Sequence, residues 1–321
     1  MPKTEFVVPP GPGAGSRLDV YLAGQVPGLS RAAAGKLIDA GKVLVWGKAG
    51  KASVRLREGD RVAVEFETAD ETAGGLKPQA IPLTILHVDE DVIVLDKPSG
   101  LVVHPGAGNE AGTLANALLA LFPEIAGVGP EERPGIVHRL DKGTSGVMVV
   151  ARSPRAYASL VVQFKRHDIR KTYIGLVYGR VASAEGHIDW PIGRHATKRK
   201  KISTHSKNPR QAETFFRVLE ALPCATLLEV TPLTGRTHQI RVHLAAAGHP
   251  IVGDALYGRK KEAKKYPRIF LHARFLSFLH PGTGERVEFA APLPAELEAI
   301  LDAERGRPGA RGSDHVDSEG T

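Results

Sequence analysis

The segment RPGIVHRLDKGTSGVMVVAR, residues 133–152, gathers side chains that could do acid–base or nucleophilic chemistry. A short apolar run leads to His138, Arg139 and Asp141 in a glycine-bounded loop, and a second apolar run follows. Loops held by flanking strands commonly display reactive side chains. A structural role is the alternative, because an aspartate two residues before a glycine often shapes a tight turn. The spacing alone favours the turn, since a single short motif is weak support for catalysis.

Familiar cofactor and nucleophile motifs fail when they are tested against this sequence. No phosphate-binding loop of the form GxxxxGK[ST] occurs, and proline breaks GPGAGS near the start before it can open a dinucleotide-binding helix. GTSG at 143–146 lacks the spacing of a serine nucleophile elbow. His238 and His243 lie about 140° apart on a helix, so they are not expected to share a metal. What remains is the chemistry of a carboxylate, a phenol and a guanidinium, for which we expect neither a metal nor a cofactor.

Composition is typical of a globular protein from a reducing compartment. The chain has 321 residues, of which 42% are hydrophobic and 24% charged, enough for about two domains. Cys224 is the single cysteine, which excludes an internal disulfide and every zinc site built from Cys-x-x-Cys pairs. The longest nearly apolar run, residues 114–122, is far shorter than the roughly 20 residues that span a bilayer. We therefore expect a cytoplasmic, monomeric protein with no membrane partner.

The hydrophobic pattern divides the chain into a small first domain, a larger second domain and a tail. Acids, paired glycines and two prolines interrupt the pattern near residues 68–82, which predicts a linker there. The tail is glycine-rich, charged and almost free of large apolar groups, so we expect it to be disordered. The expected boundaries are 1–70 for the first domain (core about 15–67), 71–82 for the linker, 83–304 for the second domain and 305–321 for the tail.

Both domains are expected to combine helices with strands. In the first, Ser16 and Ser30 are placed to cap helices over 17–25 and 31–40, and two strands follow. In the second, Ser153 and Pro154 begin a helix, and another is expected over 238–247. Strands outnumber helices and do not alternate strictly with them. This predicts an α+β fold in which a mixed, mainly antiparallel sheet is flanked by helices. Its strands are expected at about 84–88, 92–96, 171–181, 213–219, 225–231, 270–278 and 286–289.

Positive charge gathers in three separate segments. The formal net charge is +8, and residues 17–61 hold nine basic and four acidic residues. Residues 194–210 hold seven basic residues and no acid, and 259–265 hold five basic residues and one acid. Any one of these runs suits a solvated loop. Three together favour a surface that binds the phosphates of a nucleic acid.

The first basic segment resembles the alpha-L RNA-binding domain. The resemblance is carried by GSRLDVYL at 15–22, LSRAAAGKLIDAGKVLVWGK at 29–48 and LREGDRV at 56–62. It implies that the helical side chains of Arg17, Arg31 and Lys36 hold structured RNA through its backbone and shape. Trp46-Gly47 departs from the family pattern, which usually has Asn-Gly, the pair that best suits a tight hairpin.

Five further blocks, in order, resemble the RluA-type pseudouridine synthases, in particular the branch that acts on large-subunit ribosomal RNA. They are HRLDKGTSG at 138–146, KTY at 171–173, PIGRH at 191–195, GRTHQIRVH at 235–243 and GHPIVGDALYG at 248–258. The resemblance implies the fold and the reaction of that family. It also outweighs the turn interpretation of Asp141.

The same resemblance implies a role for individual residues. Asp141 would be the catalytic aspartate, Tyr173 the active-site phenol, Arg241 the guanidinium paired with the aspartate, and Arg139 the side chain that fills the gap left by a displaced base. A mobile basic loop would grip RNA through Arg194, Lys198, Arg199, Lys200 and Lys201. Further residues of the same blocks are expected to support the site: His138, Leu140, Arg236, His238 and Gln239.

The implied reaction converts uridine to pseudouridine in structured RNA. It breaks the bond from ribose C1′ to N1 and remakes it at C5 of the same base, so nothing is oxidised or transferred from a donor. The expected partner is 23S ribosomal RNA or an assembling large ribosomal subunit. Transfer RNA as substrate, or a non-catalytic RNA-binding or ribosome-assembly role, are the alternatives. Whether Asp141 attacks the sugar, attacks the base or removes the ribose 2′ proton stays open.

Overall fold

The computed structural model divides the chain into two compact units, residues 1–75 and 76–321. The residues that the structure describes are 3–11, 13–26, 29, 31–65, 76–106, 108–195, 197, 201–258 and 260–307. Within these ranges no helix is long and apolar enough to span a bilayer.

The smaller unit has two helices and a four-stranded antiparallel sheet in the order β1-β4-β2-β3. Leu18 and Leu22 of the first helix and Ile38 of the second pack with Val62 and Val64 of the sheet, and these side chains form its core. The elements are β1 Lys3–Val7, α1 Leu18–Gln25, α2 Arg31–Asp39, β2 Val43–Val45, β3 Lys48–Ala49 and β4 Arg61–Glu65.

Two features of this unit differ from the sequence-based expectation. Strand β1 was not expected, because its partner β4 lies more than fifty residues away and KTEFV has little alternation of its own. The prediction that Ser16 caps α1 is wrong: Arg17 occupies the cap position without a side-chain cap bond, and the Ser16 hydroxyl donates to the carbonyl of Gly13. Ser30 lies outside the described residues.

Trp46 and Gly47 form the two-residue turn between β2 and β3. Both have positive φ, +53° and +74°, and the flanking residues Val45 and Lys48 are paired across the strands. Positive φ at both central positions is the mark of a type I′ turn, the turn that Asn-Gly favours. The departure from Asn-Gly therefore leaves the hairpin intact.

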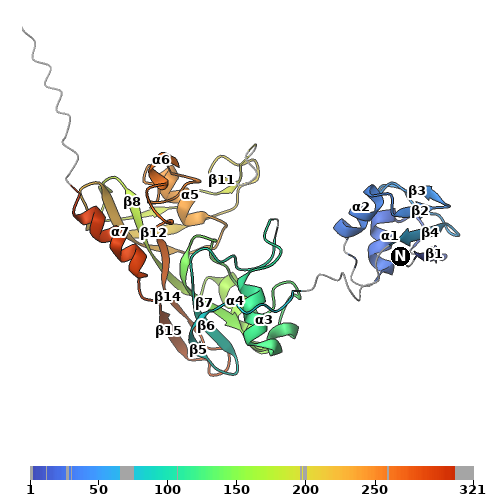
Figure 1. Cartoon of the computed structure of the whole chain (residues 1–321), viewed down its shortest axis with the longest axis horizontal. Coiled ribbons are helices and arrows are strands. Elements are labelled where there is room, and N and C mark those ends of the chain that lie inside the picture. The colour runs from blue at the N-terminus through green and yellow to red at the C-terminus, as the bar shows by residue number, and fades with distance from the viewer. Residues whose placement is uncertain are drawn as a thin grey trace, which may run out of the picture. The chain divides into compact units, whose positions relative to one another are not determined.

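The larger unit is built on a nine-stranded mixed sheet (Figure 1). The strand order is β5-β6-β7-β14-β8-β13-β12-β9, with β15 paired to β14, and among the described strands only β7 and β14 are parallel. This confirms the expected α+β class with a mainly antiparallel sheet. The strands are β5 Thr84–Val88, β6 Val92–Lys97, β7 Ser145–Ala151, β8 Arg170–Tyr178, β9 Glu185–Ile188, β12 Thr214–Ala221, β13 Ala225–Pro232, β14 Leu271–Leu279 and β15 Arg286–Ala290; β10 Gly193–Arg194 pairs separately with β11 Ile202–Ser203.

Two apolar cores hold the helices of this unit to the sheet. Leu118 of α3 and Leu160 of α4 pack in one core with β6 and β7. Leu244 of α5 and Leu301 of α7 pack in the other with β8 and β13. Ser153 caps α4 by accepting a hydrogen bond from the N–H of Ala156, as the sequence predicted. The helices are α3 Leu114–Leu121, a 3-10 helix Pro123–Gly127, α4 Pro154–Arg166, α5 Gln239–Ala246, α6 Lys260–Ala263 and α7 Ala295–Arg305.

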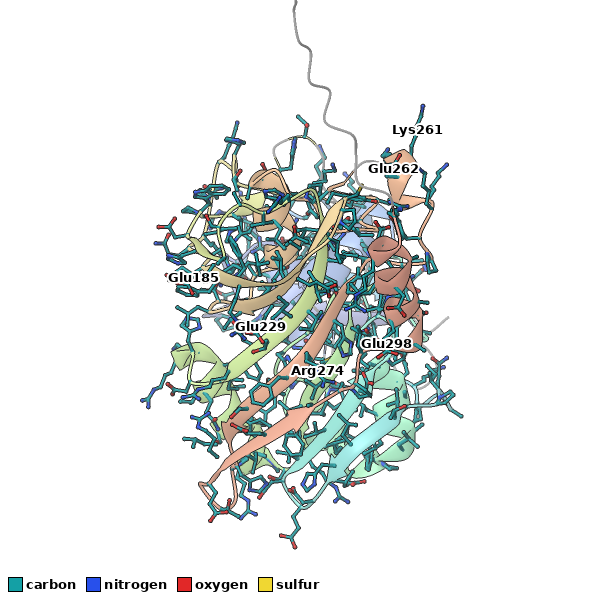
Figure 2. All side chains as sticks on the ribbon, turned by 90° about the vertical axis from the view of Figure 1, so that its left-hand side faces the viewer. Glu185, Glu229, Lys261, Glu262, Arg274 and Glu298 are labelled. Carbon is teal, nitrogen blue, oxygen red and sulfur yellow. The ribbon has the colours of Figure 1, made fainter. Side chains whose placement is uncertain are left out.

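One face of the sheet carries charged side chains. Figure 2 shows Glu229 of β13 and Arg274 of β14 on this face, with no helix in front of them. The Glu229 carboxylate accepts a hydrogen bond of 2.9 Å from Arg217 on the neighbouring strand β12. Exposed and less exposed residues alternate along β12, as expected of a strand with one solvated face.

The domain edges differ in detail from the expected boundaries. Lys77 and Gln79, placed in the linker, hydrogen bond instead to Asn116 of α3, so they belong to the larger unit. Helix α7 includes Arg305, the first residue of the expected tail. Residues 71–75 of the linker and 308–321 of the tail lie outside the described residues.

Gly146→Ala is expected to lower the free energy of unfolding by roughly 3 kcal/mol or more. Gly146 has φ +119°, and an added Cβ would lie 2.2 Å from the backbone oxygen of Ala273, where β7 and β14 pair. Gly248→Ala is the control, because Gly248 also has positive φ (+91°) but open space around it, so only the backbone cost of about 1–2 kcal/mol applies. Urea denaturation measures both, and equal losses would contradict the steric argument.

Candidate active site

The loop that carries Asp141 is fixed from several sides. Leu140 is only 4% exposed and packs in the core of β6 and β7, which anchors the chain immediately before the aspartate. The N–H of Thr144 donates to the carbonyl of Asp141 at 3.1 Å, and the N–H of Gly100 donates to the carbonyl of Lys142 at 2.7 Å. The Asp141 side chain is therefore presented from an ordered loop.

Arg241 of α5 joins Asp141 to a second carboxylate, that of Asp254. Its Nη1 donates to Oδ2 of Asp141 at 3.1 Å. Its Nε and Nη2 donate to Oδ2 and Oδ1 of Asp254 at 2.7 and 3.0 Å. A two-point contact fixes the plane of a guanidinium. Asp254 thus orients Arg241 so that one amino group remains for Asp141.

Burial and the neighbouring charges shift the pKa values of Asp254 and Tyr173. Burial opposes ionisation of Asp254, but the hydrogen bonds and charge of Arg241 outweigh it and lower the Asp254 pKa. Burial, and then the charge of Asp141, raise the pKa of Tyr173. The phenol of Tyr173 is consequently protonated near neutral pH.

Asp141, Tyr173 and Arg241 line one cavity of about 490 Å³. They reach it from the loop before β7, from β8 and from α5, so the structure brings the three together. The volume lies within the range of roughly 300–1,000 Å³ usual for ligand sites. Asp141 is the one carboxylate among the described residues that line it, whereas the lining includes several further cations: Arg133, Arg139, Lys165, Lys171 and Arg236. Such a lining suits a polyanion.

His238 and Tyr257 lie beside the ion pairs that Arg241 forms with Asp141 and Asp254. His238 precedes α5 in the left-handed conformation, φ +55°, and its Nδ1 lies 2.8 Å from the hydroxyl of Tyr257. Its Nε2 lies 3.9 Å from Oδ1 of Asp141. Burial lowers the pKa of His238 despite the nearby carboxylate. The Tyr257 ring lies 5.1 Å from the guanidinium carbon of Arg241 and so covers it.

His138 and Gln239 hold the backbone of the site in place. The Nε2 of His138 accepts a hydrogen bond from the N–H of Val149 at 3.1 Å, and burial lowers its pKa to about 3, so the ring is neutral. The side-chain carbonyl of Gln239 accepts from the Thr234 hydroxyl at 2.6 Å and from the N–H of Arg236 at 3.0 Å. The two hydrogen bonds to Gln239 fix the turn that leads into α5.

Arg17 and Arg31 lie together in the smaller unit. The Nε atoms of both donate to the buried carboxylate of Asp19 at 3.0 Å. The hydrogen bond from Arg17, with further help from Arg31, lowers the pKa of Asp19 to about 2. Lys36 is exposed on α2. Asp19 therefore fixes two of the three cations expected to hold RNA on neighbouring helices.

The remaining expected RNA contacts belong to the larger unit. Arg139 is exposed at the cavity, with Nη1 3.4 Å from Nε2 of His104. Arg194 is exposed in the short strand β10. The ammonium of Lys201 lies 5.6 Å from the ring centre of Tyr257, which links the basic segment to the site. Lys198, Arg199 and Lys200 lie outside the described residues.

Three residues of the site had no role in the sequence-based prediction. Asp254 and Tyr257 stand in the recognised block GHPIVGDALYG, but their spacing does not indicate which side chain they contact. Lys171 precedes Tyr173 by two residues, and strand alternation alone places both on one face of β8. Burial lowers the pKa of Lys171 to about 8, and no carboxylate among the described residues contributes to that shift.

Known proteins match both units. A sequence model described as RNA pseudouridylate synthase matches residues 91–246, and a model of the S4 domain matches residues 16–62. An RNA pseudouridine synthase of Synechocystis sp., named as uncharacterized, is 45% identical over 294 residues, which cover 89% of this chain and 88% of the relative.

Two further matches extend the comparison to a named enzyme and to a solved structure. Ribosomal large subunit pseudouridine synthase D of Xanthomonas campestris is 43% identical over 310 residues, 93% of this chain and 92% of that protein. The solved structure of human RNA pseudouridylate synthase domain containing 1 aligns with a TM-score of 0.56 at 29% identity, covering 73% of this chain and 98% of that one. The chain therefore belongs to the RNA pseudouridine synthase family: it is an isomerase that acts on RNA, with an S4 domain ahead of its catalytic unit.

Proposed function

We propose that this enzyme isomerises specific uridines of large-subunit ribosomal RNA, in the cytoplasm, with an ionised Asp141 and no cofactor. The observation that carries the proposal is the ion pair of Asp141 and Arg241 at the wall of a cation-lined cavity. The choice of RNA is supported by the relative from Xanthomonas campestris, whose name gives the large ribosomal subunit. The reaction itself is balanced without an added reagent, because substrate and product are isomers.

Arg241 keeps the carboxylate of Asp141 charged and oriented in this proposal. A guanidinium about 4 Å from a carboxylate attracts it by on the order of 4 kcal/mol at an effective dielectric of 20, which opposes the cost of desolvation when RNA covers the site. A lysine would supply the charge but not the planar contact with both carboxylates. Asp141 is then the group that acts on the target nucleoside.

Tyr173 contributes a protonated phenol. When C1′ has rebonded to C5 of the base, the proton on C5 must leave and N1 must gain one. Because its pKa is raised, Tyr173 carries its proton near neutral pH and has no free phenolate with which to remove the proton from C5. It takes part by passing its own proton on as it receives another, or by donating a hydrogen bond to the nucleobase.

Arg139 stabilises the extruded state of the target. Extruding a stacked base costs a few kcal/mol, and a side chain inserted into the vacancy offsets part of that cost. Arg139 is exposed, lines the cavity and is two residues from Asp141 in the sequence. These features suit it to the role.

The substrate is tested with RNA transcripts tritiated at uracil C5. We expect the purified enzyme to release tritium from a large-subunit ribosomal RNA transcript and not from a transfer RNA transcript. Release from transfer RNA alone would overturn the proposed substrate, and release from neither would overturn the proposed activity. Mapping pseudouridine in cells with and without the protein then identifies the positions.

RNA binding is expected to weaken steeply with salt. The logarithm of the affinity should fall linearly with the logarithm of salt concentration, by a slope of about 0.7 for each phosphate neutralised on single strands. Arg31→Gln should reduce that slope by about 0.7, the contribution of one phosphate. Arg305→Gln is the control, because Arg305 lies on α7, outside the three basic segments and outside the cavity lining. Filter binding at several salt concentrations measures the slopes, and a flat wild-type curve would count against the basic surface.

RNA affinity is also expected to fall as pH rises through about 8, the pKa of Lys171. The ammonium holds a phosphate below this pH, and the neutral amine above it does not. Lys171→Met removes the charge while keeping an unbranched apolar stem, and should bind RNA about tenfold more weakly near pH 7. Affinities near pH 7 and pH 9 check this. Wild-type and variant curves that fall in parallel would contradict it.

A further inference from the structure

The hairpin of the S4 domain places a large aromatic residue where the backbone disfavours it. Trp46 has φ +53° in the turn between β2 and β3. A bulky side chain in this conformation costs about 1–2 kcal/mol, which asparagine or glycine largely avoids. Strained residues of this kind persist where the surroundings hold them, and they cluster at functional positions.

Two neighbours fix the indole without covering it. Its Nε1 donates to Oδ1 of Asp60 at 2.9 Å. The guanidinium carbon of Arg61 lies 5.9 Å from the ring centre. Trp46 nevertheless remains 59% exposed, more than any other aromatic residue among the described exposed hydrophobics. Asp60 contacts one edge of the indole and Arg61 one face, so the fixed ring still presents its other face to solvent.

The charges around the ring suit a phosphate-bearing ligand. Lys48, Arg57 and Arg61 are exposed on the segments that adjoin the turn. Asp60 is occupied by the indole and by the N–H of Arg57 at 2.7 Å, and these bonds lower its pKa. Between residues 57 and 61, Glu58 is the other acid, and it is exposed. Cations therefore predominate beside the indole.

We propose that Trp46 stacks on an unpaired nucleobase of the RNA substrate, outside the target nucleoside, while the adjoining cations contact its phosphates. The inference rests on the proposed function for the identity of that RNA. Aromatic rings bordered by cations bind single-stranded bases in this way, whatever the base. A purely structural role does not require this residue, because Asn satisfies the same turn at lower cost.

Fluorescence tests the contact without altering Trp46. Trp46 and Trp190 are the two tryptophans of the chain, and both are partly exposed. Trp190→Phe leaves Trp46 as the single emitter, and titration with a large-subunit ribosomal RNA transcript should quench it by roughly half or more if a base stacks on the ring. Trp46→Phe is the matched control: its tryptophan emission comes from Trp190 alone, so it measures any change that RNA binding causes away from Trp46.

Affinity supplies the second measurement. Trp46→Asn should weaken binding of the same transcript by roughly 5- to 100-fold, the range for loss of one base–aromatic stack, with an unchanged or higher melting temperature. Trp46→Phe should retain most of the affinity. Val54→Ala removes an exposed apolar side chain from the same domain and should bind like wild type. A lower melting temperature for Trp46→Asn with affinity unchanged would show a structural role and overturn the proposal.

Tritium release from the same samples separates this inference from the proposed function. If the Trp190→Phe protein releases tritium from the transcript while Trp46 emission stays constant, Trp46 does not stack and the proposed function stands. If Trp46 is quenched but no tritium is released, the RNA contact stands and the proposed activity on that RNA fails.

Discussion

Asp141→Asn is expected to lower the rate of tritium release at least about 10³-fold, with RNA affinity within about twofold of wild type. Asparagine keeps the shape and an acceptor oxygen but has no charge with which to attack the nucleoside or remove a proton. In the proposed function RNA is held mainly by cations elsewhere, so binding should survive. Single-turnover tritium release and filter binding on the same transcript measure the two effects.

The fold of the Asp141→Asn variant is protected by the second carboxylate of the site. Arg241 keeps its two bonds to Asp254, so no buried guanidinium is left unpaired. Asp91→Asn is the matched control: Asp91 is a buried aspartate bound at two points by Arg155, and it does not line the cavity. That variant should keep its turnover per folded molecule. Tritium release by Asp141→Asn at the wild-type rate would refute the role of Asp141.

The pairing of Asp141 with Arg241 was predicted from the sequence only through family resemblance. The two residues are one hundred positions apart, and neither spacing nor periodicity links a loop before β7 to a face of α5. Asp254 shows the limit of that approach. Its block was recognised, yet only the folded chain shows that the carboxylate meets the same guanidinium.

Local pattern predicted the elements better than their edges or their distant partners. Ser153 and Pro154 mark the start of α4 because a cap and its helix are adjacent in sequence. Ser16 carries the same signal, but the chain before α1 bends so that its hydroxyl reaches Gly13 instead. Strand β1 pairs with β4, which lies more than fifty residues away, so the residues next to β1 in the sequence do not predict this contact.

Asp254→Asn is expected to damage both stability and turnover. The Asp254 side chain is 1% exposed and accepts hydrogen bonds from Arg241 and from the backbone N–H groups of Leu256 and Tyr257. Removing its charge weakens the two-point contact with Arg241 and leaves that buried guanidinium with Asp141 as its one remaining carboxylate, which should cost about 1.5–3 kcal/mol. Urea denaturation near neutral pH measures the loss. The same variant should lower kcat by roughly 10²-fold, because Arg241 is free to turn away from the geometry that Asp141 needs.

The pH dependence of this loss separates a charge effect from a packing effect. The pKa of Asp254 is lower in the folded protein than in the unfolded chain, so its carboxylate stabilises the fold above the unfolded value of about 3.9. That stabilisation is lost as pH falls through the folded pKa. The difference in unfolding free energy between wild type and Asp254→Asn should therefore shrink below about pH 4, whereas a packing defect would persist there. Turnover is then measured at a pH where both proteins are fully folded. A kcat equal to that of wild type would show that Asp254 only stabilises the fold. A reduced kcat at unchanged RNA affinity would show that Asp254 positions Arg241.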